Sequence, residues 1–211
     1  RAFSQSTRHK IMSDAFLVEH CAPTFAGLKT GNLFRISYAD IEVFREELRE
    51  LNGILKRKGL RAVPVRMTAE FALVYLYRPD FLKRDLGCEE AARLLTSLGY
   101  EPQSVNRSVA FLARMMREKE VFPHEVGLFL GYPPEDVLGF MKSSREGVKC
   151  VGCWKVYGDE TKARAAFWRF QRCREVFEEN VQRGRKLEAL IVRCTAKRQE
   201  NYRTSGGEKI A

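Results

Sequence analysis

Residues 71–79 read FALVYLYRP, an apolar run rich in β-branched and aromatic side chains that is followed by a helical pattern over residues 80–99. A run that is apolar throughout is typical of a strand buried on both faces of a sheet. Asp80 lies where the next helix would begin, and a carboxylate there accepts free backbone N–H groups. The stretch therefore predicts a strand–turn–helix unit of an α/β domain.

The same unit recurs three more times along the chain. The strand runs are NLFRIS at 32–37, VGLFL at 126–130 and VKCVGCWKV at 148–156, and each precedes a helical pattern. Strands that alternate with helices favour an α/β fold, here a mixed or mostly parallel sheet of about four strands flanked by helices. The run LRAVPVRMT at 60–68 is less clear, because Pro64 restricts any strand to a sheet edge.

The C-terminal segment predicts a long basic helix. Apolar residues at helical spacing continue from Asp159 to Cys194, and Gly184 is the point where that helix would break. From residue 160 onward 13 Lys and Arg stand against 7 Glu, which is most of the total net charge of +10. We expect a single α/β domain over 1–180, then a basic helical extension and a disordered tail over 181–211.

Composition points to an ordinary globular protein. The chain has 211 residues, of which 45% are hydrophobic and 30% charged. No stretch approaches the roughly 20 apolar residues of a membrane span, and the amino terminus lacks the pattern of a signal peptide. We therefore expect a cytoplasmic protein. Six cysteines are too sparse for a disulfide framework in a chain of this length.

Four stretches together resemble a known family: HCAPTFAGLKTGNLF at 20–34, LVYLYRP at 73–79, FPHEVGLFLGYPPEDVLGF at 122–140 and WKVYGD at 154–159. They are similar to small cytoplasmic proteins from anaerobic Gram-positive bacteria that form a domain family of unknown function. The resemblance implies an intracellular protein of an anaerobe, and it implies no reaction, substrate or cofactor. The CVGC stretch at 150–153 and the basic C-terminal stretch depart from the family pattern.

Polar side chains follow the predicted strands, at the sheet edge where open α/β folds bind ligands. Arg78 could hold a phosphate or carboxylate by paired hydrogen bonds, or it could pair with Asp80 or with a helix carboxyl end. The candidate ligand-binding residues are Lys29, Arg78, Tyr132, Lys155, Tyr157 and Asp159. From them we predict binding of a small, anionic ligand at strand-end loops.

Three residues are candidates for catalysis: Cys21, His124 and Glu125. Cys21 follows a histidine and lies near Lys29 in sequence, as in thiolate nucleophiles and metal ligands. His124 could act as a general base, with a structural role in capping a loop as the alternative. Adjacent residues of a strand face opposite ways, so Glu125 is poorly placed to orient the His124 ring.

A metal- or redox-linked accessory protein is the first alternative. Cys150 and Cys153, with Cys21 from elsewhere, could bind a transition metal or an iron–sulfur cluster, and an acidic flavodoxin-like carrier would be the partner. Against this, the chain has no second C-x-x-C pair, and CVGC lies in a strand pattern instead of opening a helix.

The second alternative places function in the basic C-terminal segment. Its Lys and Arg residues, interspersed with glutamates, could contact nucleic acid without sequence specificity or bind an acidic partner protein. The chain shows no recognition-helix signature and no RNP aromatic motif, which argues against sequence-specific readout.

Overall fold

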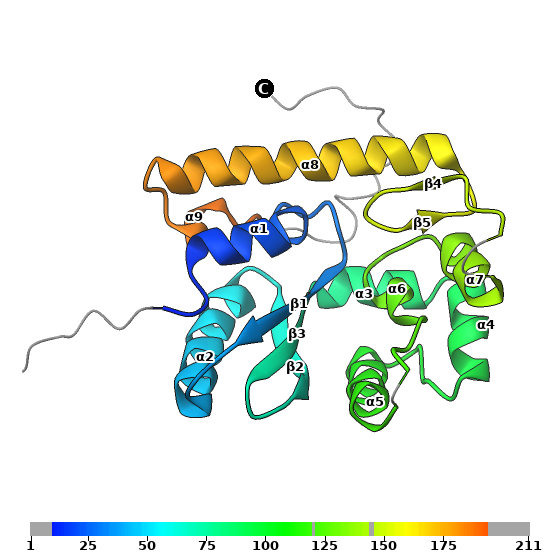
Figure 1. Ribbon diagram of the computed structural model, residues 1–211, viewed down its shortest axis with the longest axis horizontal. Coiled ribbons are helices and arrows are strands. Elements are labelled where there is room, and N and C mark those ends of the chain that lie inside the picture. The colour runs from blue at the N-terminus through cyan, green and yellow to red at the C-terminus, as the bar shows by residue number, and fades with distance from the viewer. Residues whose placement is uncertain (1–9, 120, 144–145, 194–211) are drawn as a thin grey trace, which may run out of the picture.

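The structure is a computed structural model that describes residues 10–119, 121–143 and 146–193 (Figure 1). Its described part contains a three-stranded antiparallel sheet in the order β1-β3-β2, with helices on both faces. The strands are β1 (Gly31–Ser37), β2 (Arg61–Met67) and β3 (Phe71–Tyr77). A separate antiparallel hairpin pairs β4 (Cys150–Val151) with β5 (Lys155–Val156).

In chain order the described helices are α1 (Asp14–Phe25), α2 (Ile41–Arg57), α3 (Pro79–Leu86), α4 (Glu89–Ser97), α5 (Val105–Glu118), α6 (Val126–Phe129), α7 (Pro134–Lys142), α8 (Glu160–Gln182) and α9 (Leu187–Leu190). Some of them pack on this sheet, as α1, α2 and α5 do, and others pack on neighbouring helices or on the hairpin. None of them combines the length and the apolar character that a membrane crossing requires.

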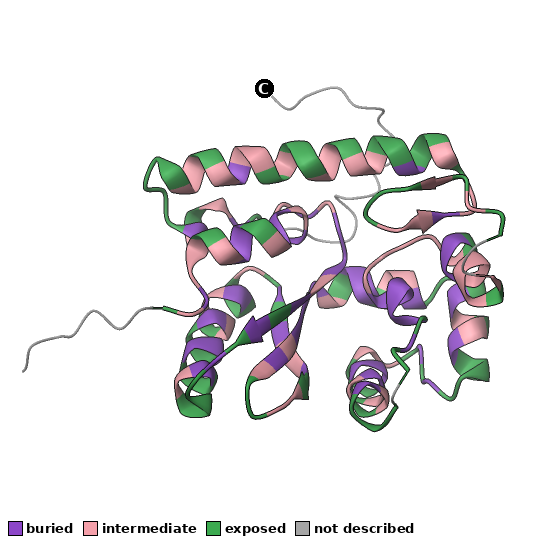
Figure 2. Ribbon diagram, viewed as in Figure 1, coloured by how far each residue is buried: buried purple, intermediate pink, exposed green. Residues whose placement is uncertain are grey.

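The central strand β3 explains why residues 71–77 are apolar throughout. Val74 and Leu76 point into a core that includes residues of α1, α2, α8 and α9. Tyr75 and Tyr77 point the other way, into a core shared with α3 to α7. Buried residues accordingly run along the sheet and along the helix sides that face it (Figure 2). The prediction that this strand is buried on both faces is confirmed.

The predicted mixed or mostly parallel sheet of about four strands is wrong, although the α/β class, with helices around a sheet, is confirmed. All strand pairs are antiparallel, and β2 and β3 form a hairpin. Pro64 lies in β2, at an edge of the sheet, beside a register shift between Pro64 and Arg66. That is where a residue without a backbone N–H is tolerated.

Two of the predicted strands have other structures. Residues 126–129 form the short helix α6, and all four are buried. Their apolar character reflects this burial on every side, and periodicity cannot separate such a helix from a buried strand. Residues 148–156 form a hairpin because the chain reverses at Gly152, whose N–H donates to Trp154 O at 3.0 Å.

The two ends of the described chain also differ in part from expectation. The HCAPT residues 20–24 lie within helix α1, and the AGLKT residues that follow connect this helix to β1. The long C-terminal helix is present as α8, and Gly184, with φ +80°, follows its end as predicted. The expected disordered tail falls largely on residues 194–211, outside the described residues.

Helix α8 spans the molecule along one side (Figure 1). Its C-terminal part packs on α1, and Phe167 in its N-terminal half meets the Trp154 ring edge-on at 4.5 Å. The helix carries five Lys and Arg against four Glu, so the basic excess of the C-terminal segment lies after Gln182. The functional role of that excess stays a prediction.

Candidate functional site

A buried carboxylate joins helix α7 to the WKVYGD stretch. Asp136, in the first turn of α7, is only 3% exposed. It accepts hydrogen bonds from Trp154 Nε1 at 2.7 Å and from the backbone N–H groups of Tyr157 at 2.7 Å and Gly158 at 2.8 Å. Hydrogen bonds to a carboxylate are stronger than neutral ones. Asp136 therefore fixes residues 154–158 against α7.

Tyr132 and Trp154 form an aromatic wall beside this carboxylate. Their rings stack with centroids 4.7 Å apart and an interplanar angle of 27°. The Tyr132 hydroxyl donates to Cys153 O at 3.2 Å, and burial raises the pKa of Tyr132 to about 12. Gly139 of α7 brings the helix backbone against the Tyr157 ring, because a Cβ at position 139 would overlap that ring.

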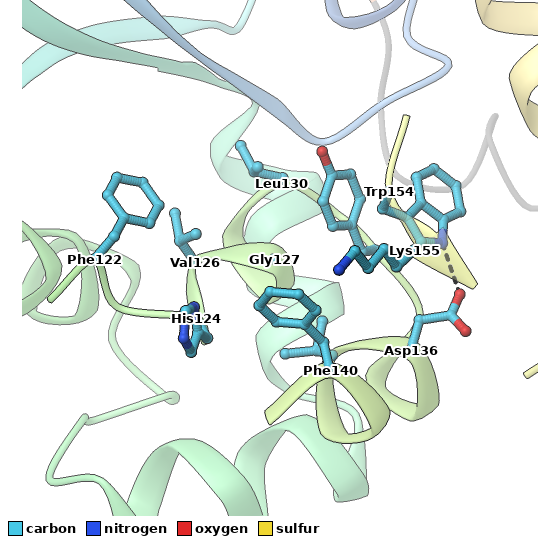
Figure 3. A pocket seen from close by; sticks show the side chains of 11 residues that line it. Phe122, His124, Val126, Gly127, Leu130, Asp136, Phe140, Trp154 and Lys155 are labelled. Atoms are coloured by element: carbon cyan, nitrogen blue, oxygen red, sulfur yellow. Dashed lines mark hydrogen bonds between the residues drawn. The ribbon is translucent and has the colours of Figure 1, made fainter. Parts of the chain in front are cut away.

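A pocket of about 410 Å³ opens between α6, α7 and the β4–β5 hairpin (Figure 3). This volume lies within the usual range of small-molecule sites. Most of its lining is apolar or aromatic. The lining residues are Phe122, His124, Val126, Gly127, Leu130, Tyr132, Asp136, Val137, Phe140, Trp154 and Lys155.

Two basic side chains meet at Phe140 in this pocket. Lys155 Nζ lies 5.3 Å from the centroid of the Phe140 ring, and the His124 ring meets it edge-on at 4.8 Å. Figure 3 shows Lys155 extending toward Phe140 with His124 on the other side of that ring. An ammonium and an imidazole on an aromatic surface can bind the anionic end of a flat ligand.

Lys29 lies behind the pocket wall, in the segment between α1 and β1. Its side chain is 9% exposed, and its Nζ lies 5.2 Å from the centroid of the Tyr132 ring. Among the described residues, no Asp or Glu oxygen lies within ion-pair distance of this ammonium. Burial lowers the pKa of Lys29 to about 8, opposed by the nearby Cys153 and Cys21.

Arg78 is occupied by backbone carbonyls. Its guanidinium donates from Nε to Thr24 O at 2.7 Å and from NH2 to Phe25 O at 2.8 Å, at the end of helix α1. It also donates to Val192 O at 2.7 Å. Of the roles considered for Arg78, pairing with a helix carboxyl end is the one this geometry matches.

The three catalytic candidates have different surroundings. Cys21 is fully buried in α1, and burial raises the pKa of its thiol far above the ordinary value, which disfavours a nucleophilic thiolate. Glu125 is buried and accepts a hydrogen bond from Tyr100 OH at 2.8 Å. His124 is exposed at the pocket, so it and Glu125 face different surroundings, although they lie in a turn before α6 and not in the predicted strand.

Tyr157 and Asp159 have partners within the same loop region. Tyr157 OH donates to Ser143 O at 2.9 Å. Asp159 caps helix α8 by accepting the Lys162 N–H at 3.0 Å, and this hydrogen bond is the main cause that lowers the pKa of Asp159. The ligand-binding candidate Asp159 therefore acts as a helix cap in the structure.

The cysteines of CVGC lie on the small hairpin. Cys150 is half-buried in β4, and Cys153 is exposed in the turn before β5. In the part of the chain that the structure describes, no group of three or more His, Cys, Asp and Glu side chains is placed to hold a metal ion. The cluster of Cys21, Cys150 and Cys153 thus gains no support from the geometry.

Sequence reasoning missed the importance of Asp136, Trp154 and Phe140. Asp136 follows Pro133 and Pro134 in a run typical of a helix start, and in the structure it is also the anchor of the WKVYGD stretch. The available signal was that YPPED and WKVYGD both belong to the stretches that carry the family resemblance. The structure joins these two stretches through the hydrogen bonds of Asp136.

Comparison with known proteins places the chain in a family. A family model described as Protein of unknown function (DUF3793) matches residues 17–191. Searches of curated proteins and of solved structures give no match. The resemblance inferred from HCAPT, FPHEVGLFLGYP and WKVYGD is thereby confirmed at the level of a family of unknown function, and the expected bacterial origin stays a prediction. Because the match covers most of the chain, this protein belongs to the DUF3793 family.

Proposed function

We propose that this protein binds a small anionic ligand with a flat, apolar body in the pocket between α6, α7 and the β4–β5 hairpin. The observation that carries the proposal is the meeting of Lys155 and His124 at the Phe140 ring, inside a pocket with aromatic walls. The body of the ligand would lie along Tyr132 and Trp154, and its anionic group would lie at Lys155.

The rigidity of the pocket wall supports this role. Asp136 and the stack of Tyr132 on Trp154 hold one wall in place without a ligand. A preformed site loses less conformational entropy on binding than one that must be ordered first. The site differs from the predicted one, because it lies at a hairpin and two helices instead of at the ends of parallel strands.

The partner of the basic C-terminal segment and the cellular location of the protein stay predictions. A partner for the basic C-terminal segment, whether nucleic acid or an acidic protein such as a flavodoxin-like carrier, has no site among the described residues that favours it. A cytoplasmic location is likewise expected from composition alone.

A matched pair of fluorescent probes tests the pocket. The first is 8-anilinonaphthalene-1-sulfonate, an aromatic anion, and the second is N-phenyl-1-naphthylamine, which lacks the sulfonate. We expect saturable binding of the anion, and Lys155→Met should weaken it by about tenfold or more because it removes a charge-assisted contact. The same variant should leave binding of the uncharged probe nearly unchanged.

The control is Lys142→Met, which removes an exposed lysine of α7 outside the pocket lining. It should bind both probes as the unmodified protein does. Phe140→Ala should weaken both probes because it removes the aromatic surface that they share. Equal affinity of the anionic probe for the Lys155→Met variant and the unmodified protein would overturn the proposal.

A further inference from the structure

Strand β1 presents an unpaired edge of the three-stranded sheet. Tyr38 N–H, directly after the strand, donates to Glu70 O at 2.9 Å in continuation of the β1–β3 pairing. Residues of an antiparallel strand alternate in the side to which their backbone groups point, so the even-numbered residues of β1 bond to β3. The N–H and C=O groups of Leu33, Arg35 and Ser37 therefore point away from β3. In the described part of the chain, no group is hydrogen-bonded to them.

The two edges of this sheet differ in how they are protected. At the β2 edge, Pro64 lacks an N–H, the register shifts between Pro64 and Arg66, and helix α5 packs on the strand. Proline, bulges and covering helices are the usual devices that keep a further strand away from a sheet edge. Strand β1 contains no proline, and its seven residues pair with β3 in unbroken register. The β1 edge thus keeps the geometry that a further strand requires.

A groove lies beside the β1 edge, between the strand and the start of helix α1. Ile36 and the half-buried side chains of Ile11 and Phe16 give it an apolar lining. Phe16 also packs edge-on against the Phe34 ring of β1, with the ring centroids 5.7 Å apart. Apolar side chains of an added strand could therefore be buried here, next to the free backbone groups.

The charged residues that line this groove are both basic. Lys10 and Arg35 are exposed, and the Arg35 guanidinium lies 3.9 Å from the centroid of the Phe71 ring. Among the described residues, neither of them has an Asp or Glu oxygen within ion-pair distance. The carboxylate of Glu47, which lies against the same N-terminal segment, accepts the N–H groups of Ile11 and Met12. The groove therefore favours an acidic occupant.

We propose that the β1 edge binds an extended, acidic segment of a partner protein as a fourth strand of the sheet. The backbone of that segment would bond to Leu33, Arg35 and Ser37, and its carboxylates would lie near Lys10 and Arg35. A second copy of β1 fits less well, because antiparallel pairing of β1 with itself brings two Arg35 side chains near each other. The groove shares no lining residue with the ligand pocket, so this proposal does not depend on the function proposed above.

Two acetylated and amidated heptapeptides, EVTVEVE and KVTVKVK, test the proposal by isothermal titration calorimetry on the full chain. We expect saturable binding of the acidic peptide and binding of the basic one that is about tenfold weaker or more. Amide exchange followed by NMR identifies the added strand. The N–H groups of Leu33, Arg35 and Ser37 should exchange more slowly when the acidic peptide is bound, whereas those of Phe34 and Ile36, which face β3, should change little.

Two variants separate the backbone from the charge. Ser37→Pro removes an outward N–H without removing a β1–β3 hydrogen bond, and it should weaken the acidic peptide by about tenfold. Arg35→Glu should weaken the acidic peptide by a similar factor and strengthen binding of the basic one. The control is Arg66→Glu, which makes the same charge change at an exposed position of β2 and should alter neither affinity. Circular dichroism establishes that each variant is folded.

Three results would overturn the proposal. The first is the absence of saturable binding of the acidic peptide, and the second is binding that neither Ser37→Pro nor Arg35→Glu weakens. The third is a dimer in analytical ultracentrifugation that Ser37→Pro dissociates, because a second copy of the chain would then occupy the edge.

Discussion

Two buried cations, Lys29 and Arg78, have opposite surroundings in this protein. Arg78 donates hydrogen bonds to three backbone carbonyls, whereas Lys29 lies against an aromatic ring with no carboxylate among its described neighbours. The first arrangement stabilises the fold, whereas burial of the Lys29 ammonium against a ring opposes its charged form. Replacing each cation by methionine, which keeps much of the apolar stem, should separate these effects.

We expect Lys29→Met to raise the free energy of unfolding at pH 7 by about 1–3 kcal/mol, because an ammonium with a lowered pKa is destabilising when charged. Between about pH 8 and the ordinary lysine pKa of 10.5, the folded state binds fewer protons than the unfolded state. The stability of the unmodified protein relative to the variant should therefore rise over this window, and the advantage of the variant should fade. Urea unfolding at pH 7, 9 and 10 measures this trend. An advantage that did not change with pH would contradict it, and Lys142→Met is the exposed control.

We expect Arg78→Met to lower the free energy of unfolding by about 3–5 kcal/mol, because the buried carbonyls of Thr24 and Phe25 would lose their charged donor. Arg93→Met, at an exposed position of α4, should change it by less than about 1 kcal/mol. Urea unfolding at neutral pH compares the two. If Arg78→Met were as stable as the unmodified protein, the structural role of Arg78 would be contradicted, and its predicted ligand-binding role would be favoured again.

At the scale of elements, the shortest helix and strands are stabilised by contacts with other parts of the protein. Strands β4 and β5 have two residues each, and a hairpin of that size is not stable alone in water. Asp136 and the Tyr132 ring hold it to α7 and to the segment after α6. Helix α6, with four residues, is likewise held by burial.

Asp136→Ala should therefore release the hairpin. We expect it to lower the free energy of unfolding by about 2–4 kcal/mol, because it leaves one indole N–H and two backbone N–H groups without their carboxylate. Hydrogen exchange at residues 150–158 should become faster than in the unmodified protein, while exchange in β3 stays slow. Asp80→Ala, at an exposed position of α3, is the control. Unchanged protection of the hairpin would show that the aromatic stack holds it without Asp136.

At the scale of the whole molecule, the C-terminal described segment closes over helix α1. Leu187 and Ile191 belong to the core that includes α1 and α2. The backbone N–H of Val192 donates to Phe25 O at 3.0 Å, and its carbonyl accepts from Arg78. The expected boundary between a domain over 1–180 and an extension over 181–211 stays a prediction. It can be tested by removing a side chain that makes these contacts.

Ile191→Ala should lower the free energy of unfolding by about 2–4 kcal/mol, because it deletes a side chain that is 2% exposed in the core. Val192→Ala removes a neighbouring side chain that is 40% exposed and should cost less than about 1 kcal/mol. Thermal or urea unfolding measures both. An Ile191→Ala variant as stable as the unmodified protein would support a separate extension beginning near residue 181.

The sequence by itself was sufficient for features that depend on neighbouring residues and for membership of the family. Ser104 and Asp159 are residue types that favour helix starts and cap α5 and α8, and the buried residues Phe44, Leu48, Leu51 and Leu55 of α2 recur at helical spacing. The side chains of β3 alternate between two cores, so the strand is a run of apolar residues that the sequence alone shows. These signals are local, because capping and helical spacing arise within a few residues along the chain.

Only the tertiary structure decided the direction of the strands, the helix at residues 126–129, the partner of Arg78 and the joining of Asp136 to Trp154. Each depends on groups far apart in the sequence, such as Arg78 and Val192. A short buried run has the same composition whether it forms a helix or a strand. The residues next to a charged residue in the sequence do not show whether its side chain will contact a carbonyl, an aromatic ring or a ligand. Burial decides these outcomes, because a polar group removed from water needs a partner within the protein, and the fold determines which partner is near.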